Sequence, residues 1–189
     1  MQKEIKASLK GDASKESDKI VLTSGLRSQG EVRIEQKFDF ESSSWRCNFT
    51  VNISEPEGIS DVDGQGGDGV RMKLCSESGQ ELFAVTLDTY KNLENQSGNE
   101  VVIYFEGTRV AQAACRERFN DGQDKEVEVI YDNELETVVV KVNDLAVVAY
   151  AFNDIAFYEM VKEPVFLCFS SFTGDAGGKH EIFNISLDF

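Results

Sequence analysis

Apolar and polar side chains alternate along most of the chain after Ile20. The first alternating segment carries the apolar residues Val32, Ile34, Phe38 and Phe40. The second, from Trp45 to Ile53, repeats the alternation and leaves Asn48 and Asn52 on its polar side. A period of two turns one face of a strand toward a core and the other toward water. The pattern therefore predicts antiparallel strands that are buried on one face.

Eight further segments show the same apolar character, and turn residues separate them. They span 70–74, 82–87, 101–105, 127–131, 138–142, 146–152, 165–169 and 183–189. The tripeptide Asp132-Asn133-Glu134 is typical of a hairpin turn between two strands. Only 111–118 and 155–161 are expected to form helix, as single turns. About ten short strands predict an all-β chain folded as an antiparallel β-sandwich.

The domain organisation follows from where the alternation starts. Residues 1–19 are polar, show no hydrophobic period and are expected to form a flexible leader. Residues 20–189 are expected to form one sandwich domain, since no linker or internal repeat interrupts them. The leader lacks the apolar stretch of a signal peptide, so either the chain stays in the cytosol or its signal has been removed.

The acidic composition limits the kinds of partner. A formal charge of −15 disfavours nucleic acid and anionic membrane surfaces, because both are bound through clustered Lys and Arg. The charge leaves carboxylates available for a cation, although solubility explains most of it. The chain has no run of about 18 apolar residues, so membrane insertion is not expected.

Cysteines and glycosylation sequons bear on the compartment. The four cysteines match no metal or redox spacing, and three of them lie in strand-like segments, where a thiol acts as a small apolar group. They are Cys47, Cys75, Cys115 and Cys168. Asn-X-Ser/Thr sequons are in excess, which indicates the secretory route. They lie at Asn48, Asn52, Asn95 and Asn184.

Three polar loops that contain glycine or asparagine interrupt the strands, at 61–69, 88–99 and 173–180. Loops held by a rigid scaffold are where binding residues usually lie. We expect the three loops to meet at one edge of the sandwich and to form a ligand site there.

The loop that begins at Asp88 carries candidate ligands for a hard cation. In an extended segment Asp88, Tyr90 and Asn92 point the same way, so a carboxylate, a backbone carbonyl and an amide oxygen converge. Calcium takes about six to eight oxygen ligands, including carboxylates. Glu94 and Glu106 are acidic candidates to complete the set. An ordinary polar strand end is the alternative interpretation.

Four sequence blocks occur in the order typical of one known family. They are Gly66 to Val70, Leu87 to Asn92, Glu106 to Thr108 with Ala113 to Asn120, and Phe169 to Asp175 with His180. Through these blocks the chain resembles the L-type lectins, which include the legume seed lectins and the mannose-binding cargo receptors of the early secretory pathway. The likeness spans about residues 20–189 and implies a concanavalin-like jelly roll.

The resemblance implies a role for the residues in these blocks. The implied carbohydrate-binding residues are Asp68, Gly69, Tyr90, Asn92, Gly174 and Asp175. The implied metal ligands are Asp88, Tyr90, Asn92 and Glu106. Calcium is the implied cofactor, and a glycan or glycoprotein is the implied partner.

The chain also departs from the family pattern. Thr86 stands where the seed lectins have a Glu that binds a transition metal, and Glu100 falls near their His, so no transition metal is expected. The loop between the Asp-Gly turn and the calcium strand is cut to 75–80, and the mannose-contacting His of the cargo receptors is absent. Cys115 matches a family cysteine whose disulfide partner is missing near Phe152.

Two functions follow as hypotheses. The first is a calcium-dependent lectin module for mannose- or glucose-type glycans, in the secretory pathway or outside the cell. The second is a sandwich that has lost its sugar site and acts as a protein-interaction or structural domain, and a cytoplasmic location is the alternative.

Catalysis is not expected, because the carboxylate motif of sandwich glycosidases falls on Thr86, Asp88 and Lys91. Self-association follows only by analogy with other sandwich lectins.

Overall fold

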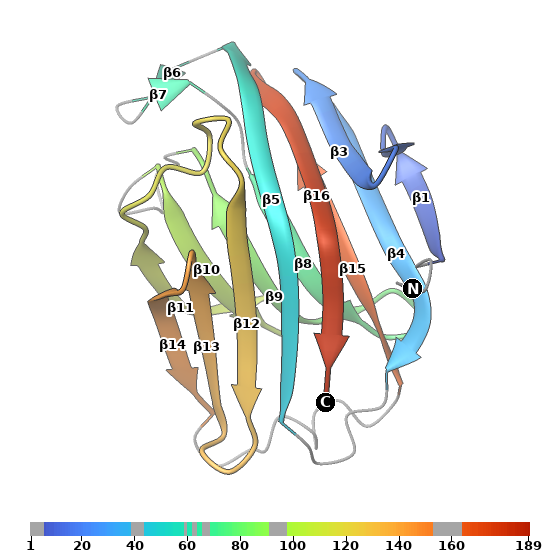
Figure 1. Cartoon of the computed structure of the whole chain (residues 1–189), viewed down its shortest axis with the longest axis vertical. Coiled ribbons are helices and arrows are strands. Elements are labelled where there is room, and N and C mark those ends of the chain that lie inside the picture. Colours follow the sequence, from blue (N-terminus) through green and yellow to red (C-terminus); the bar gives the residue numbers. More distant parts are fainter. Residues whose placement is uncertain are drawn as a thin grey trace.

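The computed structural model describes residues 6–38, 44–58, 60–61, 64–65, 69–90, 98–152 and 164–189. These residues form two seven-stranded antiparallel sheets and a two-stranded ribbon, which confirms the predicted all-β sandwich (Figure 1). None of them forms a helix with the length and apolar character that crossing a bilayer requires.

The two sheets, called sheet A and sheet B, each take strands from both halves of the chain. Sheet A has the order β1 (Ala7–Gly11), β4 (Gln29–Phe38), β15 (Val165–Phe172), β8 (Val70–Cys75), β9 (Glu81–Asp88), β10 (Glu100–Phe105) and β11 (Thr108–Ala114). Sheet B has the order β14 (Leu145–Ala151), β13 (Thr137–Val142), β12 (Lys125–Asp132), β5 (Trp45–Gly58), β16 (Ala176–Asp188), β3 (Lys19–Gly25) and β2 (Ser14–Glu16). The ribbon pairs β6 (Ser60–Asp61) with β7 (Gly64–Gln65).

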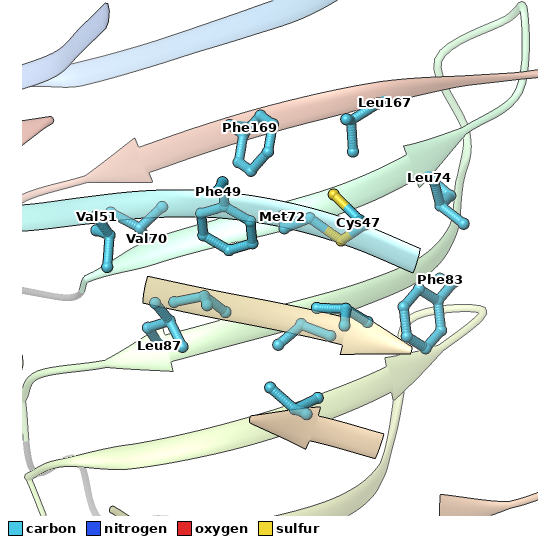
Figure 2. Close-up of a cluster of buried hydrophobic side chains, with 14 of the residues drawn as sticks. Cys47, Phe49, Val51, Val70, Met72, Leu74, Phe83, Leu87, Leu167 and Phe169 are labelled. Atoms are coloured by element: carbon cyan, nitrogen blue, oxygen red, sulfur yellow. The ribbon is translucent and has the colours of Figure 1, made fainter. Parts of the chain in front are cut away.

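The core lies between the sheets and is built from alternate residues of each strand. On β5, Cys47, Phe49 and Val51 point toward sheet A (Figure 2). The ring of Phe49 meets the ring of Phe169 on β15 edge to face, with centroids 4.9 Å apart. Burying one such side chain contributes about 1.5–3 kcal/mol. The predicted period of two therefore becomes the packing of sheet A on sheet B.

Residues 7–16 form edge strands in place of the expected flexible leader. β1 pairs with β4, from Ala7 opposite Ile34 to Gly11 opposite Gly30, and β2 pairs with β3. The domain therefore includes residues that precede the expected start at residue 20. Hydrophobic alternation does not mark these strands, because neither of the two edge strands contains a buried residue.

The expected turns have different outcomes. The hairpin after β12 is confirmed, since the Asp132 carboxylate accepts hydrogen bonds from the backbone N–H groups of Glu134 (2.9 Å) and Leu135 (3.1 Å). The helical turn expected at 111–118 is wrong, because its first half belongs to β11. The turn expected at 155–161 lies outside the described residues.

Candidate ligand-binding rim

The strands that carry the expected binding residues end at one side of the sandwich. β15, β8 and β9 are antiparallel neighbours in sheet A, so the end of β15, the start of β8 and the end of β9 meet. The end of β5 and the start of β16 reach the same side, at the top of Figure 1. We call this side the upper rim, and its described residues are 25–28, 58, 69–70, 88–90, 98–100 and 172–176.

Gly69 is held tightly at the upper rim. Its φ is +84°, and a Cβ atom on it would lie 1.8 Å from the carbonyl oxygen of Leu87. Only glycine fits this contact, because it has no Cβ and adopts positive φ without strain. The Gly69 carbonyl accepts a hydrogen bond of 2.7 Å from the hydroxyl of Ser171. β9 and β15 thus fix Gly69 from two sides.

A buried histidine supports this contact from sheet B. His180 is the single histidine of the chain, is fully buried, and its Nδ1 is hydrogen-bonded to the Ser171 hydroxyl. Since the Ser171 hydroxyl donates to Gly69, the Nδ1–H of a neutral imidazole is the donor to Ser171. Burial lowers the pKa of His180 to about 4, which keeps the ring neutral at physiological pH. His180 and Ser171 thus link the core to the rim.

Asp88 ends β9 on the outer face of sheet A, the face turned away from sheet B. Its Oδ1 accepts a hydrogen bond of 3.0 Å from the backbone N–H of Tyr90, which turns the chain out of the strand. Asp88 lies directly opposite Glu100 on β10, and Glu100 is buried. Cβ atoms of such opposed pairs are about 4.5–5.5 Å apart. Two carboxylates therefore share one corner of the rim.

Glu106 lies at the other end of the same strand pair. Its N–H donates to the carbonyl of Leu82 (2.9 Å), beyond the pairing of Phe105 with Phe83. β10 is 6 residues long, so about 20 Å of strand separates Glu106 from Asp88. The structure does not bring Glu106 to the other expected ligands, which removes it from the ligand set that we propose below. Glu100 takes its place beside Asp88.

Gly174 and Asp175 lie on the upper rim between β15 and β16. The Gly174 carbonyl accepts a hydrogen bond from the Arg27 backbone N–H (3.0 Å). The Asp175 carboxylate oxygen Oδ1 accepts from Nε (3.0 Å) and Nη2 (2.8 Å) of the Arg27 guanidinium. Thr173 adds a hydrogen bond from its hydroxyl to the Gly25 carbonyl (2.7 Å). The loop is anchored on the β3–β4 connection, and the Asp175 carboxylate is turned toward Arg27.

Two other expected features can be placed only in part. Asp68 and Asn92 lie outside the described residues. The shortened loop, expected to affect the sugar site, is a tight turn in which the Gly79 N–H donates to the Ser76 carbonyl (3.0 Å). This turn joins β8 to β9 at the end opposite Gly69, so its length takes nothing from the upper rim.

A metal site is not complete among the residues that the structure describes. In these ranges no three His, Cys, Asp or Glu side chains gather closely enough to hold a metal ion. Asp88 and Glu100 supply two of the hard oxygen ligands that calcium prefers. The other expected side-chain ligand, Asn92, belongs to the segment that lies outside the description.

Two of the sequon asparagines differ in how far they are exposed to solvent. Asn52, expected on the polar face, is 8% exposed and its amide donates to the Gly122 carbonyl (3.0 Å) and Asp124 Oδ1 (2.7 Å). Asn184 is exposed on β16.

All four cysteines are free thiols, and the three in strands, Cys47, Cys75 and Cys168, are buried. Burial raises the pKa of the Cys47 thiol, which suits a core residue rather than a reactive one.

Comparison with known proteins shows the fold. No protein-family model and no curated sequence matches the chain. The carbohydrate recognition domain of Emp47p matches with a TM-score of 0.74 at 17% identity, covering 96% of this chain and 87% of that one. The exoplasmic/lumenal domain of VIP36, in a Ca²⁺- and Man3GlcNAc-bound form, gives 0.73 at 15% identity, covering 96% and 83%.

A plant lectin extends the same result. Winged bean acidic lectin, complexed with methyl-α-D-galactose, matches with a TM-score of 0.81 at 16% identity and covers 98% of this chain and 92% of that one. The chain therefore has the sandwich fold shared by the L-type lectin recognition domains and the legume lectins.

Proposed function

We propose that the chain is a carbohydrate-binding module that holds calcium and a glycan at the upper rim and catalyses no reaction. The observation that carries the proposal is the register of sheet A, which sets Gly69 beside Asp88 and Asp88 opposite Glu100. Gly69 and Asp88 are the positions that the sequence blocks associate with sugar and calcium. The fold shared with carbohydrate recognition domains supports the same conclusion.

The corner of the rim offers the chemistry that calcium requires. Asp88 and Glu100 contribute carboxylates, and the Tyr90 carbonyl and the Asn92 side chain are the proposed further ligands. Oxygen donors without imidazole favour calcium over a softer metal. When bound, calcium supplies a fixed positive centre that neutralises the two carboxylates. The Asp88–Tyr90 turn then keeps the start of the following loop in one conformation.

The glycan is bound by hydrogen bonds that the rim sets in advance. Asp68 and Asn92 are the proposed partners of two neighbouring hydroxyl groups, and Gly69, Gly174 and Asp175 line the approach. A sugar binds by displacing ordered water from such groups. We expect low affinity for a single sugar and useful binding that is multivalent. We propose mannose- or glucose-type glycans as the ligands.

The calcium part of the proposal is tested by thermal unfolding with and without calcium. At about 100 times its Kd, calcium stabilises a folded chain by about 2.7 kcal/mol, which raises the Tm of a domain of this size by about 5–10 °C. We expect Asp88→Asn to lose this rise and Glu106→Gln, the matched control at the far end of the strand, to keep it. Equal Tm values in calcium and in EDTA for the unmodified chain would contradict calcium binding.

The sugar part is tested on an array of mannose-, glucose- and galactose-terminated oligosaccharides. We expect calcium-dependent retention on mannose or glucose probes and its loss in Asp68→Ala and Asn92→Ala. Binding of a protein partner that survives both substitutions, with no glycan retained, would instead support the protein-interaction hypothesis. We place the function in the secretory pathway or outside the cell, on the strength of the sequon excess and the lumenal origin of the VIP36 domain.

A further inference from the structure

Phe172 is a large aromatic residue that remains open to solvent at the upper rim. It ends β15 and is 55% exposed. Two residues nearer the start of the same strand, Phe166 and Cys168, are only 4% and 3% exposed. Single exposed apolar residues are common on protein surfaces. The exposure of Phe172 alone therefore does not indicate a binding role, and its position in sheet A has to be considered.

The register of sheet A places Phe172 in line with the proposed site. Ser171 pairs with Val70, so the next residue, Phe172, lies beside Gly69. Gly69 in turn packs against the end of β9, where Asp88 lies. Neighbouring strands are about 4.8 Å apart, so about 10 Å separates Phe172 from Asp88 across the strand. One oligosaccharide can contact both residues.

Phe172 and Asp88 also lie on the same face of sheet A. Ser171 points toward sheet B, where it bonds to His180, so the alternate residue Phe172 points outward. Leu87 belongs to the core, so Asp88 points outward as well. Outward side chains of both strand ends therefore border one surface.

The outer face of sheet A also carries a fixed polar group. Arg71 on β8 donates through Nε to Glu81 Oε2 (2.9 Å) and through Nη1 to the Thr86 hydroxyl (2.7 Å). Its guanidinium carbon lies 4.0 Å from the centroid of the Tyr104 ring. These contacts hold the guanidinium in place. Phe172 itself adjoins Gly69, which carries no side chain.

We propose that Phe172 is a stacking platform for a hexopyranose ring bound at the upper rim. The inference rests on the proposed function and deepens it, because it names the side chain that recognises the ring itself. A hexopyranose exposes C–H groups on its ring faces and hydroxyl groups around its edge. An aromatic face attracts C–H groups by dispersion and through the negative charge of its π system. The hydroxyl groups on one edge of the stacked ring then point toward Gly69 and Asp88.

The platform favours some ligands over others. A linear polyol has no rigid C–H face, and an anionic ligand loses hydration against the ring and is repelled by the negative charge of its π system. Tyr90, the aromatic residue among the carbohydrate-binding residues that the resemblance implies, is half-buried in the structure. Phe172 is the more exposed of the two aromatic side chains and lies on the other side of Gly69.

The test compares substitutions of Phe172 on the oligosaccharide array and in solution with the mannose-, glucose- and galactose-terminated probes. We expect Phe172→Ala to weaken binding by about fivefold to tenfold and Phe172→Trp to retain it. Phe189→Ala is the matched control, since Phe189 is 57% exposed near the opposite end of the sandwich. We expect the control to bind as the unmodified chain does, and all Tm values to agree within a few degrees.

Phe172→Trp adds a direct readout of contact. The natural tryptophan, Trp45, is 2% exposed and lies in the core. A new indole at the rim is exposed, so we expect its fluorescence to shift to shorter wavelength when a probe sugar covers it. The linear polyol sorbitol should leave the emission unchanged.

The outcomes separate the stacking inference from the proposed function. If the unmodified chain binds a sugar and Phe172→Ala binds it equally well, only the stacking inference is overturned. If Phe189→Ala weakens binding as much as Phe172→Ala, the inference is also overturned, because position at the rim is then irrelevant. If the unmodified chain binds none of the probes, the proposed function and the inference both fail.

Discussion

Acidification is expected to destabilise the folded chain through one residue, His180. Its ring is buried between the sheets with Nδ1 bonded to Ser171, and burial lowers its pKa to about 4. In the unfolded chain an ordinary histidine has a pKa of about 6.5. Between these two values the unfolded state binds a proton that the folded state does not. The stability that the neutral ring contributes is therefore complete above pH 6.5 and is lost as the pH falls toward 4.

The size of the effect follows from the two pKa values. Each pH unit between them changes the free energy of unfolding by about 1.4 kcal/mol. A decrease from about pH 7.5 to about pH 5 therefore costs about 2 kcal/mol, a large part of the stability of an average domain. Carboxylates whose pKa is lowered in the fold, such as Asp12 and Asp121, lose their contribution at lower pH, because their ordinary values are near 4.

The assay has two parts, and both use the fact that the chain has a single histidine. Urea unfolding at several pH values gives the pH dependence for the unmodified chain and for His180→Gln, which cannot titrate in this range. The difference between the two slopes isolates His180, even if the variant is less stable at every pH. NMR of the imidazole C–H groups gives the pKa directly.

The expected result is an imidazole signal that stays in its neutral position down to about pH 5. A signal that titrates near the ordinary value of about 6.5 would refute the reasoning. So would equal pH slopes for the unmodified chain and His180→Gln. Either result would mean that the ring is hydrated or charged in the folded state, and that the link to Gly69 is not held as described.

Two further predictions concern the rim and the sequons. Gly69→Ala should cost at least about 2 kcal/mol more than Gly107→Ala in urea unfolding: both glycines have positive φ, but a Cβ at position 107 meets nothing within 4 Å. Equal losses would show that the close contact of Gly69 is not rigid. In cells that glycosylate the chain, peptide mapping should find a glycan on Asn184 and none on Asn52, whose amide is buried in hydrogen bonds. A glycan on Asn52 would contradict this placement.

Much of the fold was predictable because the relevant information is local. The alternation from Trp45 to Ile53 reflects one buried face of β5, and a residue needs only its immediate neighbours to show it. The turn at Asp132 is local in the same way, since the carboxylate caps N–H groups two and three residues away. The likeness to L-type lectins then gave the strand arrangement, and the matched structures confirm that fold.

The candidate site was predictable only where its residues lie close to a strand end. Gly69 and Asp88 flank β8 and β9, which are joined by a short turn, so their meeting follows once both strands are recognised. Glu106 was misplaced because the sequence does not reveal that β10 and β11 form a hairpin there. The antiparallel pairing of β10 with β9 puts Glu100, rather than Glu106, opposite Asp88.

The sequence by itself determined that this chain is a β-sandwich with acidic, glycine-containing loops, because hydrophobic alternation and turn residues act over a few neighbouring positions. The tertiary structure alone decided which strand ends share the rim, that residues 7–16 complete both sheets, and that Phe172 stands beside Gly69. These features depend on the register between strands far apart in the chain. Register is decided by hydrogen bonding and packing across the whole sheet, which no short stretch of sequence contains.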